Sequence, residues 1–139
     1  MNELAHIKFP FPVKQEVYWG EMDAFNHMNN VIYFRYFETG RVEFLNKTGL
    51  WTLFFEEEIR IVVGRLECNF LREIIHPEEI EIAVGIVKVG NSSLTVVHKI
   101  SVKNEIRAYG EAIIVATNPH TGKSKPWSDK LRMEFGKWV

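Results

Sequence analysis

Residues 19–47 have the sequence WGEMDAFNHMNNVIYFRYFETGRVEFLNK. The first part, up to Asn29, is polar and follows Gly20, which is typical of a loop. From Asn30 onward, apolar side chains recur every three or four residues, until Thr48-Gly49 gives a stop signal. This spacing predicts a helix over residues 30–47. Because apolar residues also occupy its other faces in the first half, we expect the helix to be buried inside the protein.

The sequence on either side of this helix alternates between polar and apolar residues, as strands do. A short strand is expected at residues 14–19, ahead of the helix. The four runs that follow the helix are residues 60–72, 79–89, 94–102 and 106–117. The turn signals between these runs are His76-Pro77, then Gly90-Asn91 in the order of a type II′ hairpin, then Asn104. Ser128 is expected to cap a short C-terminal helix through Phe135.

This order of elements predicts an α+β fold in which an antiparallel β-sheet wraps around one long central α-helix. No repeat or linker divides the 139 residues, so we expect residues 1–139 to form a single domain. An open sheet leaves unpaired edges, which another copy of the chain could cover. We therefore expect a homodimer or homotetramer. The inward face of the run 60–72 is expected to consist of Val62, Gly64, Leu66, Cys68 and Phe70.

The composition argues against several classes of protein. Seventeen basic and 18 acidic residues give a net charge of -1, which leaves no basic excess for nucleic acid or an anionic membrane. We expect neither a signal peptide nor a membrane span, because no apolar stretch is long enough. The lone cysteine, Cys68, rules out an intrachain disulfide and fits a reducing, cytoplasmic location. The histidines lack the spacing of metal ligands, so we expect no metal and no cofactor.

The polar loop brings a carboxylate, that of Asp23, to the start of the predicted helix. Backbone N–H groups at the N-terminus of a helix carry partial positive charge and favour anions. The carbonyl of a thioester becomes an oxyanion when it is attacked, and such N–H groups can stabilise it. A carboxylate that acts as nucleophile or base therefore fits well beside these donors.

The loop resembles the signature of the 4-hydroxybenzoyl-CoA thioesterase-like hotdog family. That signature consists of an acidic residue, any residue, Asp, two residues, Gly, His, any residue and two Asn. The matching residues here are Glu21, Asp23, Asn26, His27, Asn29 and Asn30. The likeness continues through residues 33–41, 70–72, 110–111 and 121–123, and so covers nearly the whole chain. Asn26 replaces the usual glycine, but asparagine tolerates the left-handed conformation, so we expect the turn to be kept.

The resemblance implies a hotdog fold and an acyl-CoA thioesterase that hydrolyses an acyl-CoA to free acid and CoA. The aromatic residues of the loop and the predicted helix favour a short-to-medium aliphatic or aromatic acyl group. It assigns catalysis to Asp23, as nucleophile or as general base, and leaves that choice open. The helix N-terminal N–H groups would form the oxyanion hole. From their places in the loop and at the start of the helix, the residues expected to bind substrate are His27, Asn29, Asn30, Val31 and Tyr33.

Other interpretations of the same residues stay open. Asp23 is also the kind of residue that forms local turn bonds. Glu21 fits a supporting role better than an acid/base pair with Asp23. Cys68 and His98 share the apolar face of their runs and fit the core better than a reactive site. Glu73 resembles a glutamate used in plant acyl-carrier-protein thioesterases. The cations that could meet CoA phosphates are Arg60, Arg65, Arg72, Lys88 and Lys103.

A hotdog hydratase or dehydratase that acts on acyl thioesters would not predict the pattern from His27 to Asn30. Two other functions compete with the acyl-CoA hydrolase. One is a non-catalytic hotdog module that binds an acyl thioester without cleaving it, since a fold alone does not determine function. The other is a thioesterase that acts on acyl-carrier protein in place of acyl-CoA. Tight binding without turnover would indicate the first.

Overall fold

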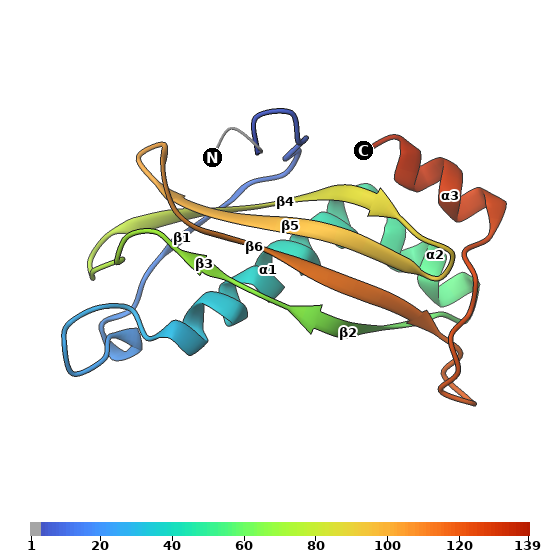
Figure 1. Ribbon diagram of the computed structural model, residues 1–139, viewed down its shortest axis with the longest axis horizontal. Helices are drawn as coiled ribbons and strands as arrows, with labels where there is room; N and C mark the ends of the chain where they lie inside the picture. Colours follow the sequence, from blue (N-terminus) through green and yellow to red (C-terminus); the bar gives the residue numbers. More distant parts are fainter. Residues whose placement is uncertain (1–3) are drawn as a thin grey trace.

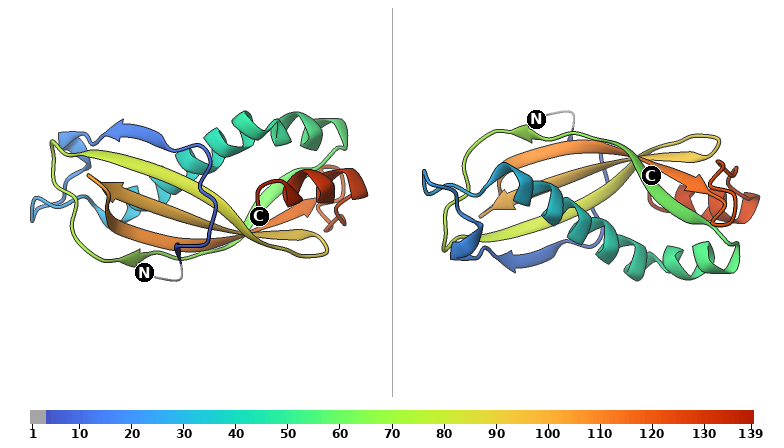
Figure 2. Two further views of the ribbon diagram at one scale, coloured as in Figure 1. Left: turned by 90° about the horizontal axis from the view of Figure 1, so that it is seen from above. Right: turned by 90° about the horizontal axis from the view of Figure 1, so that it is seen from below.

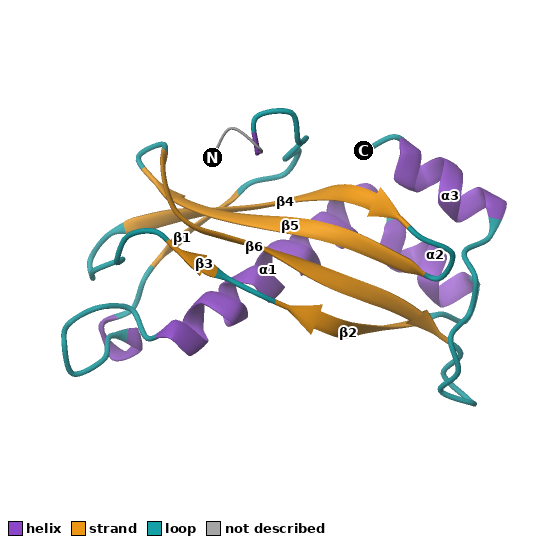
Figure 3. Cartoon of the chain, viewed as in Figure 1, coloured by secondary structure: helices purple, strands orange, loops and turns teal. Residues whose placement is uncertain are grey.

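A computed structural model describes residues 4–139 and shows one curved antiparallel sheet with its longest helix lying along one face (Figure 1). The strand order is β1-β4-β5-β6-β2, and β3 also pairs with β6. The strands are β1 (Val13–Glu16), β2 (Arg60–Leu66), β3 (Asn69–Phe70), β4 (Glu79–Val89), β5 (Ser93–Val102) and β6 (Glu105–Thr117). The helices are α1 (Asn30–Thr48), α2 (Leu50–Glu56) and α3 (Asp129–Gly136), with a 3-10 turn at Trp19–Glu21 (Figure 3).

Helix α1 lies across the concave face of the sheet, as the view from below shows (Figure 2, right). Its buried residues are spaced by three and four positions and form one stripe: Tyr33, Tyr36, Phe37, Gly40, Phe44 and Leu45. A Cβ atom at Gly40 would lie 2.8 Å from methyl groups of Ile82 and Val84 on β4, so glycine allows the helix to approach the sheet closely. The predicted α+β hotdog fold is therefore confirmed.

The helices differ from the prediction in two respects. The expected burial of α1 applies to its sheet-facing side alone, because Val31 is 62% exposed and Val42 is also exposed. Helix α2 was not expected. Gly49 takes a left-handed conformation with φ of 78°, which ends α1 and redirects the chain into α2. Leu50 and Phe54, one helical turn apart, are the buried residues of α2.

The run 60–72 also differs from the prediction, because it breaks into β2 and β3. A register shift between Val63 and Arg65 interrupts the alternation, and β2 lies at the edge of the sheet. Of the expected inward face, Val62, Gly64 and Phe70 are exposed, while Leu66 and Cys68 are partly buried. Alternation predicts a buried face only where another layer covers the strand.

Two turns can be compared with the prediction. The β4–β5 hairpin closes through the Gly90 N–H, which donates to the Ser93 carbonyl at 2.8 Å, so Gly90 precedes the two central residues. The expected type II′ order, with Gly90 as the first central residue, is therefore wrong. In the β5–β6 turn, Lys103 and Asn104 both have positive φ, as a type I′ turn requires.

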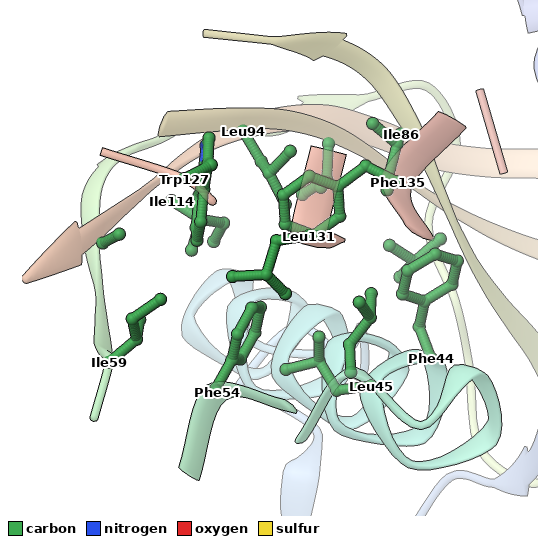
Figure 4. Close-up of a cluster of buried hydrophobic side chains, with 14 of the residues drawn as sticks. Phe44, Leu45, Phe54, Ile59, Ile86, Leu94, Ile114, Trp127, Leu131 and Phe135 are labelled. Atoms are coloured by element: carbon green, nitrogen blue, oxygen red, sulfur yellow. The ribbon is translucent and has the colours of Figure 1, made fainter. Parts of the chain in front are cut away.

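The core has two clusters of buried side chains beneath α1. One joins the C-terminal half of α1 to α2 and α3, where Phe54, Trp127 and Phe135 pack ring against ring (Figure 4). Ser128 caps α3 as expected, since its Oγ accepts from the Leu131 N–H. The other cluster surrounds Tyr33, Tyr36 and other residues near the N-terminal half of α1. It supports the end of the molecule that carries the candidate site.

His98 lies on β5 and is fully buried in this core. Its ring stacks on Phe37 with centroids 4.3 Å apart. Its Nδ1 lies 3.1 Å from the Gly110 carbonyl, which can only accept, so Nδ1 donates and Nε2 accepts from the Arg41 guanidinium at 3.0 Å. The structure thus places His98 as an inward histidine with both ring nitrogens bonded.

The outer face of the sheet is covered by the N-terminal segment, which crosses it on the side opposite α1 (Figure 2, left). The Lys8 carbonyl lies against Gly85 on β4, where a Cβ atom would overlap it. The same segment also contacts the C-terminal end of the chain, where the ring centroids of Phe11 and Trp138 are 5.3 Å apart. Among the helices of residues 4–139, none is long and apolar enough to cross a membrane.

Candidate active site

The loop that carries Asp23 is a tight turn between the 3-10 turn and α1. The Asp23 N–H donates to the His27 carbonyl at 2.7 Å, and the Asn26 N–H donates to the Asp23 carbonyl at 3.0 Å. Asn26 has φ of 63°, so it adopts the left-handed conformation that we expected it to tolerate. The turn is therefore kept without glycine.

The Asp23 carboxylate serves this turn with one of its oxygens. Oδ1 accepts from the N–H groups of Phe25 at 2.9 Å and His27 at 3.1 Å. Oδ2 accepts no hydrogen bond from the described residues, 4–139. The local turn role and a chemical role are thus compatible, because the bonds to Oδ1 hold the carboxylate in one orientation while Oδ2 stays available.

The N-terminus of α1 lies next in the chain. Asn29 is the N-cap: its Oδ1 accepts from the Val31 N–H at 3.1 Å and its carbonyl from the Ile32 N–H at 2.9 Å. Of the helix N-terminal N–H groups that were expected to form an oxyanion hole, that of Val31 is therefore already bonded. The Asn30 N–H is the open donor, since it has no partner in the part of the chain that the structure describes.

A pocket of about 530 Å³ brings most of the sequence-derived site residues together. The residues that line it from the loop and α1 are Asp23, His27, Met28, Asn29, Asn30 and Tyr33. Val31 does not line it. The opposite wall of the pocket consists of Phe70, Leu71, Arg72 and Glu73. The sequence had suggested separate roles for Arg72 and Glu73, but it had not placed this wall at the site.

Phe70 and Tyr33 form the aromatic part of the pocket. Phe70 is 50% exposed, and its ring meets the buried Tyr33 edge to face, with centroids 4.9 Å apart. Burial raises the pKa of Tyr33 to about 12, so its hydroxyl stays protonated and neutral. The Phe70-Leu71-Arg72 match in the family resemblance was the signal in the sequence that pointed to this wall.

The wall is fastened to β6 by Arg107. Its guanidinium donates to the Glu73 carbonyl at 2.7 Å and to both oxygens of Glu78, at 3.1 and 2.9 Å. Its Nε donates to Glu105 at 2.6 Å. The Arg107 carbonyl accepts from the N–H groups of Leu71 and Arg72. These bonds lower the pKa of Glu78 and hold it ionised.

The Asp23 loop rests on this wall. The Met28 N–H donates to the Ile74 carbonyl at 2.8 Å, one residue beyond Glu73. Arg107, in the chain far from Asp23, therefore supports the site through the loop 71–78. A contact of this kind depends on how the sheet curls, and sequence patterns carry no signal for it.

Other candidates from the sequence lie apart from the chemistry. Of the five cations suggested for CoA phosphates, all within residues 4–139, Arg72 alone lines this pocket, and its Nη1 pairs with Glu105 at 2.7 Å. Cys68 is partly buried, and burial raises the pKa of its thiol to about 12, which disfavours a thiolate. In the described part of the chain, no group of three or more His, Cys, Asp or Glu side chains is arranged to hold a metal ion.

Comparison with solved structures finds thioesterases among the proteins that share this fold. The chain superimposes on the thioesterase complexed with coenzyme A and Zn from Thermus thermophilus with a TM-score of 0.78 and 28% identity, covering 91% of this chain and 98% of that one. For the predicted thioesterase from Bacillus stearothermophilus the TM-score is 0.82, with 28% identity and coverage of 93% and 96%. DHNA-CoA thioesterase from Staphylococcus aureus shares the fold at 18% identity, with a TM-score of 0.81 and coverage of 91% and 88%.

Sequence comparison agrees with the structural one. The uncharacterized protein YsmA of Bacillus subtilis (strain 168) is 33% identical over 124 residues, which cover 88% of this chain and 82% of YsmA. The model of the thioesterase-like superfamily matches residues 17–135, from just after β1 to the last turn of α3. This match includes the Asp23 loop, α1 and the whole of the pocket wall. The chain therefore belongs to the thioesterase-like superfamily.

Proposed function

We propose that the protein is a thioester hydrolase that cleaves an acyl-CoA to the free acid and CoA. The observation that carries the proposal is that Asp23 and Asn30 line one pocket at the N-terminus of α1. The Asn30 N–H has no hydrogen-bond partner within residues 4–139, and Oδ2 of Asp23 has none there either. One group is suited to attack or to take a proton, and the other to stabilise negative charge.

Each group has a defined part in the reaction. The thioester carbonyl oxygen accepts from the Asn30 N–H, whose helix N-terminal position favours the oxyanion of the tetrahedral intermediate. Tyr33 and Phe70 line the acyl portion, which suits short-to-medium aliphatic or aromatic groups. His27 and Asn29 line the same pocket and orient the substrate or the attacking water.

Two routes to the products remain. In the first, Oδ2 of Asp23 attacks the carbonyl carbon, the C–S bond breaks, and CoA leaves as thiolate; water then hydrolyses the resulting mixed anhydride. In the second, Asp23 takes a proton from a water molecule, which attacks the carbonyl carbon directly, and CoA again leaves as thiolate. Both routes consume one water and give acid and CoA.

CoA is the proposed carrier for two reasons. A relative of the same fold at 28% identity is a thioesterase complexed with coenzyme A. Arg72, whose side chain is 63% exposed, stands at the pocket and can face a phosphate there. The alternative carrier, an acyl-carrier protein, is tested by offering both.

A second copy of the chain completes the proposed enzyme as a homodimer or homotetramer. The edge strand β2 exposes Val62 and Val63, and its outer side pairs with no strand of residues 4–139. Several large apolar side chains around the site are exposed as well: Tyr18, Trp19, Phe25, Val31, Phe70 and Leu71. Apolar surface of this kind is typical of an interface.

Release of free thiol from a panel of acyl-CoAs tests the proposal. The panel runs from acetyl-CoA to palmitoyl-CoA and includes benzoyl-CoA and phenylacetyl-CoA, with one matching acyl-carrier-protein substrate. We expect turnover by the wild type and a loss of about 10³-fold or more in kcat for Asp23→Asn, because the amide can neither attack nor take a proton. The variant should remain folded, since its Oδ1 still accepts from Phe25 and His27.

Each other outcome has a clear meaning. Binding of an acyl-CoA without turnover would replace the hydrolase with a non-catalytic binding module. Turnover of the carrier-protein substrate alone would replace CoA as the carrier. Full activity in Asp23→Asn would remove Asp23 from the mechanism and leave it as a turn residue.

A further inference from the structure

Glu21 joins the start of the Asp23 loop to helix α1. Its Oε1 accepts from the Tyr36 hydroxyl at 2.6 Å and from the Tyr18 N–H at 2.8 Å. Tyr36 lies on the sheet-facing stripe of α1 and is only 4% exposed. A hydrogen bond between a phenol and a carboxylate is charge-assisted, and shielding from water strengthens it.

The same residue also holds the far end of the loop. The Glu21 carbonyl accepts from the Asn29 N–H at 2.9 Å, and a bridge between Met22 and Met28 follows inside it. Asn29 is the N-cap of α1 and directly precedes Asn30. The loop of residues 22–28 is thus closed at its neck by Glu21, while Asp23 lies within it.

We infer that Glu21 and Tyr36 are a positioning pair that fixes the Asp23 carboxylate relative to the Asn30 N–H. Through its carbonyl, Glu21 holds the residue before the proposed oxyanion donor. Through its side chain, it ties the segment that carries Asp23 to the rigid body of α1. The inference rests on the proposed function, because it concerns the alignment of that function's two reacting groups.

The geometry separates this role from a direct chemical one. Glu21 does not line the pocket of Asp23, and its Oε1 already accepts two hydrogen bonds. Glu21 therefore reaches the substrate only through the backbone that it holds. Small errors in the placement of reacting groups are costly, since a displacement of about 1 Å can lower a rate about 100-fold.

Steady-state kinetics of four variants test the inference on the best acyl-CoA of the panel. Tyr36→Phe removes the phenol hydroxyl and leaves the ring in the core. We expect kcat to fall about tenfold with KM within about twofold, because alignment and not binding is lost. The kcat of Glu21→Ala should fall at least as far as that of Tyr36→Phe. Glu21→Gln should keep kcat within about threefold of wild type, because the amide oxygen still accepts from Tyr36 and Tyr18.

Two controls distinguish positioning from general weakening. Glu43→Gln removes a carboxylate from the same helix, where Glu43 pairs with Lys47 at 3.8 Å on the surface, and should leave kcat unchanged. The second control is the fourth test variant, which combines Tyr36→Phe with Asp23→Asn. It should be as active as Asp23→Asn alone, because the two changes affect one step. All rates are measured well below the melting temperature of each variant, so that every variant is folded.

The possible outcomes separate the two claims. An active wild type with unchanged kcat in Tyr36→Phe would overturn the positioning pair and leave the hydrolase standing. A tenfold loss of kcat on Tyr36→Phe that recurs in the Asp23→Asn background would also overturn it. So would a tenfold loss of kcat in Glu21→Gln. A wild type without turnover on any thioester would overturn the proposed function and the pair with it.

Discussion

Single residues in the proposed site combine structural tasks with the chemical roles that we propose for them. Asp23 uses one carboxylate oxygen to hold its own turn and keeps the other available at the pocket. Asn29 caps α1 with its side chain and thereby occupies the Val31 N–H. The proposed oxyanion donor is therefore the Asn30 N–H and not the Val31 N–H. A turn role and the proposed reactive role are therefore compatible at position 23, because the turn bonds hold the carboxylate in one orientation.

His98 gives a pH dependence that can be measured. Burial, with Arg41 next to the ring, lowers its pKa from 6.5 to about 3. The unfolded chain therefore binds one more proton than the folded chain between these values, and stability is lost as the pH falls below about 6.5. Between about pH 4.5 and 5.5 we expect His98 to contribute about 1.4 kcal/mol per pH unit to the slope of the unfolding free energy.

Urea unfolding at a series of pH values measures this slope. His98→Gln keeps a donor for Gly110 and an acceptor for Arg41 but cannot titrate. Its slope should be smaller than that of the wild type by about 1.4 kcal/mol per pH unit. Equal slopes in the two proteins would show that His98 titrates normally in the folded state.

Among the elements, the loop 71–78 is held by a side chain that lies far from it in the sequence. Arg107 on β6 binds two carboxylates and a backbone carbonyl of the pocket wall, and this wall carries the Asp23 loop through Ile74. Helix α1 is more self-sufficient, since its N-cap, its buried stripe and its Gly49 terminus are all encoded locally. The site is thus a stable helix end facing a wall that one arginine holds.

Replacing Arg107 should weaken this wall. Arg107→Met leaves Glu78 and the Glu73 carbonyl without their partner, and we expect a loss of about 3 kcal/mol of stability. The matched control is Arg65→Met, whose surface pair with Glu67 at 3.2 Å should change stability by about 0.5 kcal/mol or less. Chemical denaturation of both variants measures the difference, and similar losses would contradict the assigned role.

The pH dependence of these two proteins gives an independent check. Because the Arg107 bonds lower the pKa of Glu78 below its ordinary 4.5, the pair stabilises the fold above that pH and loses its effect as the pH falls further. The destabilisation of Arg107→Met relative to wild type should therefore shrink on acidification below about pH 4.5. A constant difference down to about pH 3 would argue against an ionised Glu78 as the partner.

At the scale of the whole molecule, the curved sheet covers one side of α1 and leaves β2 as an open edge. The other side of α1 and the apolar side chains around the pocket are also exposed in the single chain. A closed two-fold pairing of β2 with its copy would bury this edge. Antiparallel pairing centred near Val63 would bring that residue close to its own counterpart.

This arrangement predicts the effect of a charge at the centre of the edge. The wild type should have at least twice the chain mass of 16.3 kDa in solution at micromolar concentration. Val63→Lys should shift it toward the monomer, because two like charges would face each other across the pairing. Met133→Lys, at a position on α3 that is 74% exposed, is the control. Light scattering after size exclusion measures all three, and a monomeric wild type would rule the assembly out.

The sequence by itself determined the features that repeat locally. Periods of three to four and of two residues indicated α1 and the later strands, and the polar motif marked Asp23, His27, Asn29 and Asn30 as candidates for one site. These signals are readable because each depends on neighbours in the chain, such as a cap, a turn or an alternating face. The same reasoning missed α2, since a single buried pair one turn apart is too short a pattern.

Only the tertiary structure decided which residues meet across the chain. It brought Phe70 and Glu73 opposite Asp23, placed Arg107 beneath their loop, and joined Tyr36 to Glu21. It also exposed the face of β2 that alternation alone would bury. The physical reason is that these contacts depend on the curvature of the sheet and on which strand forms its edge, and neither is encoded in any short stretch of sequence.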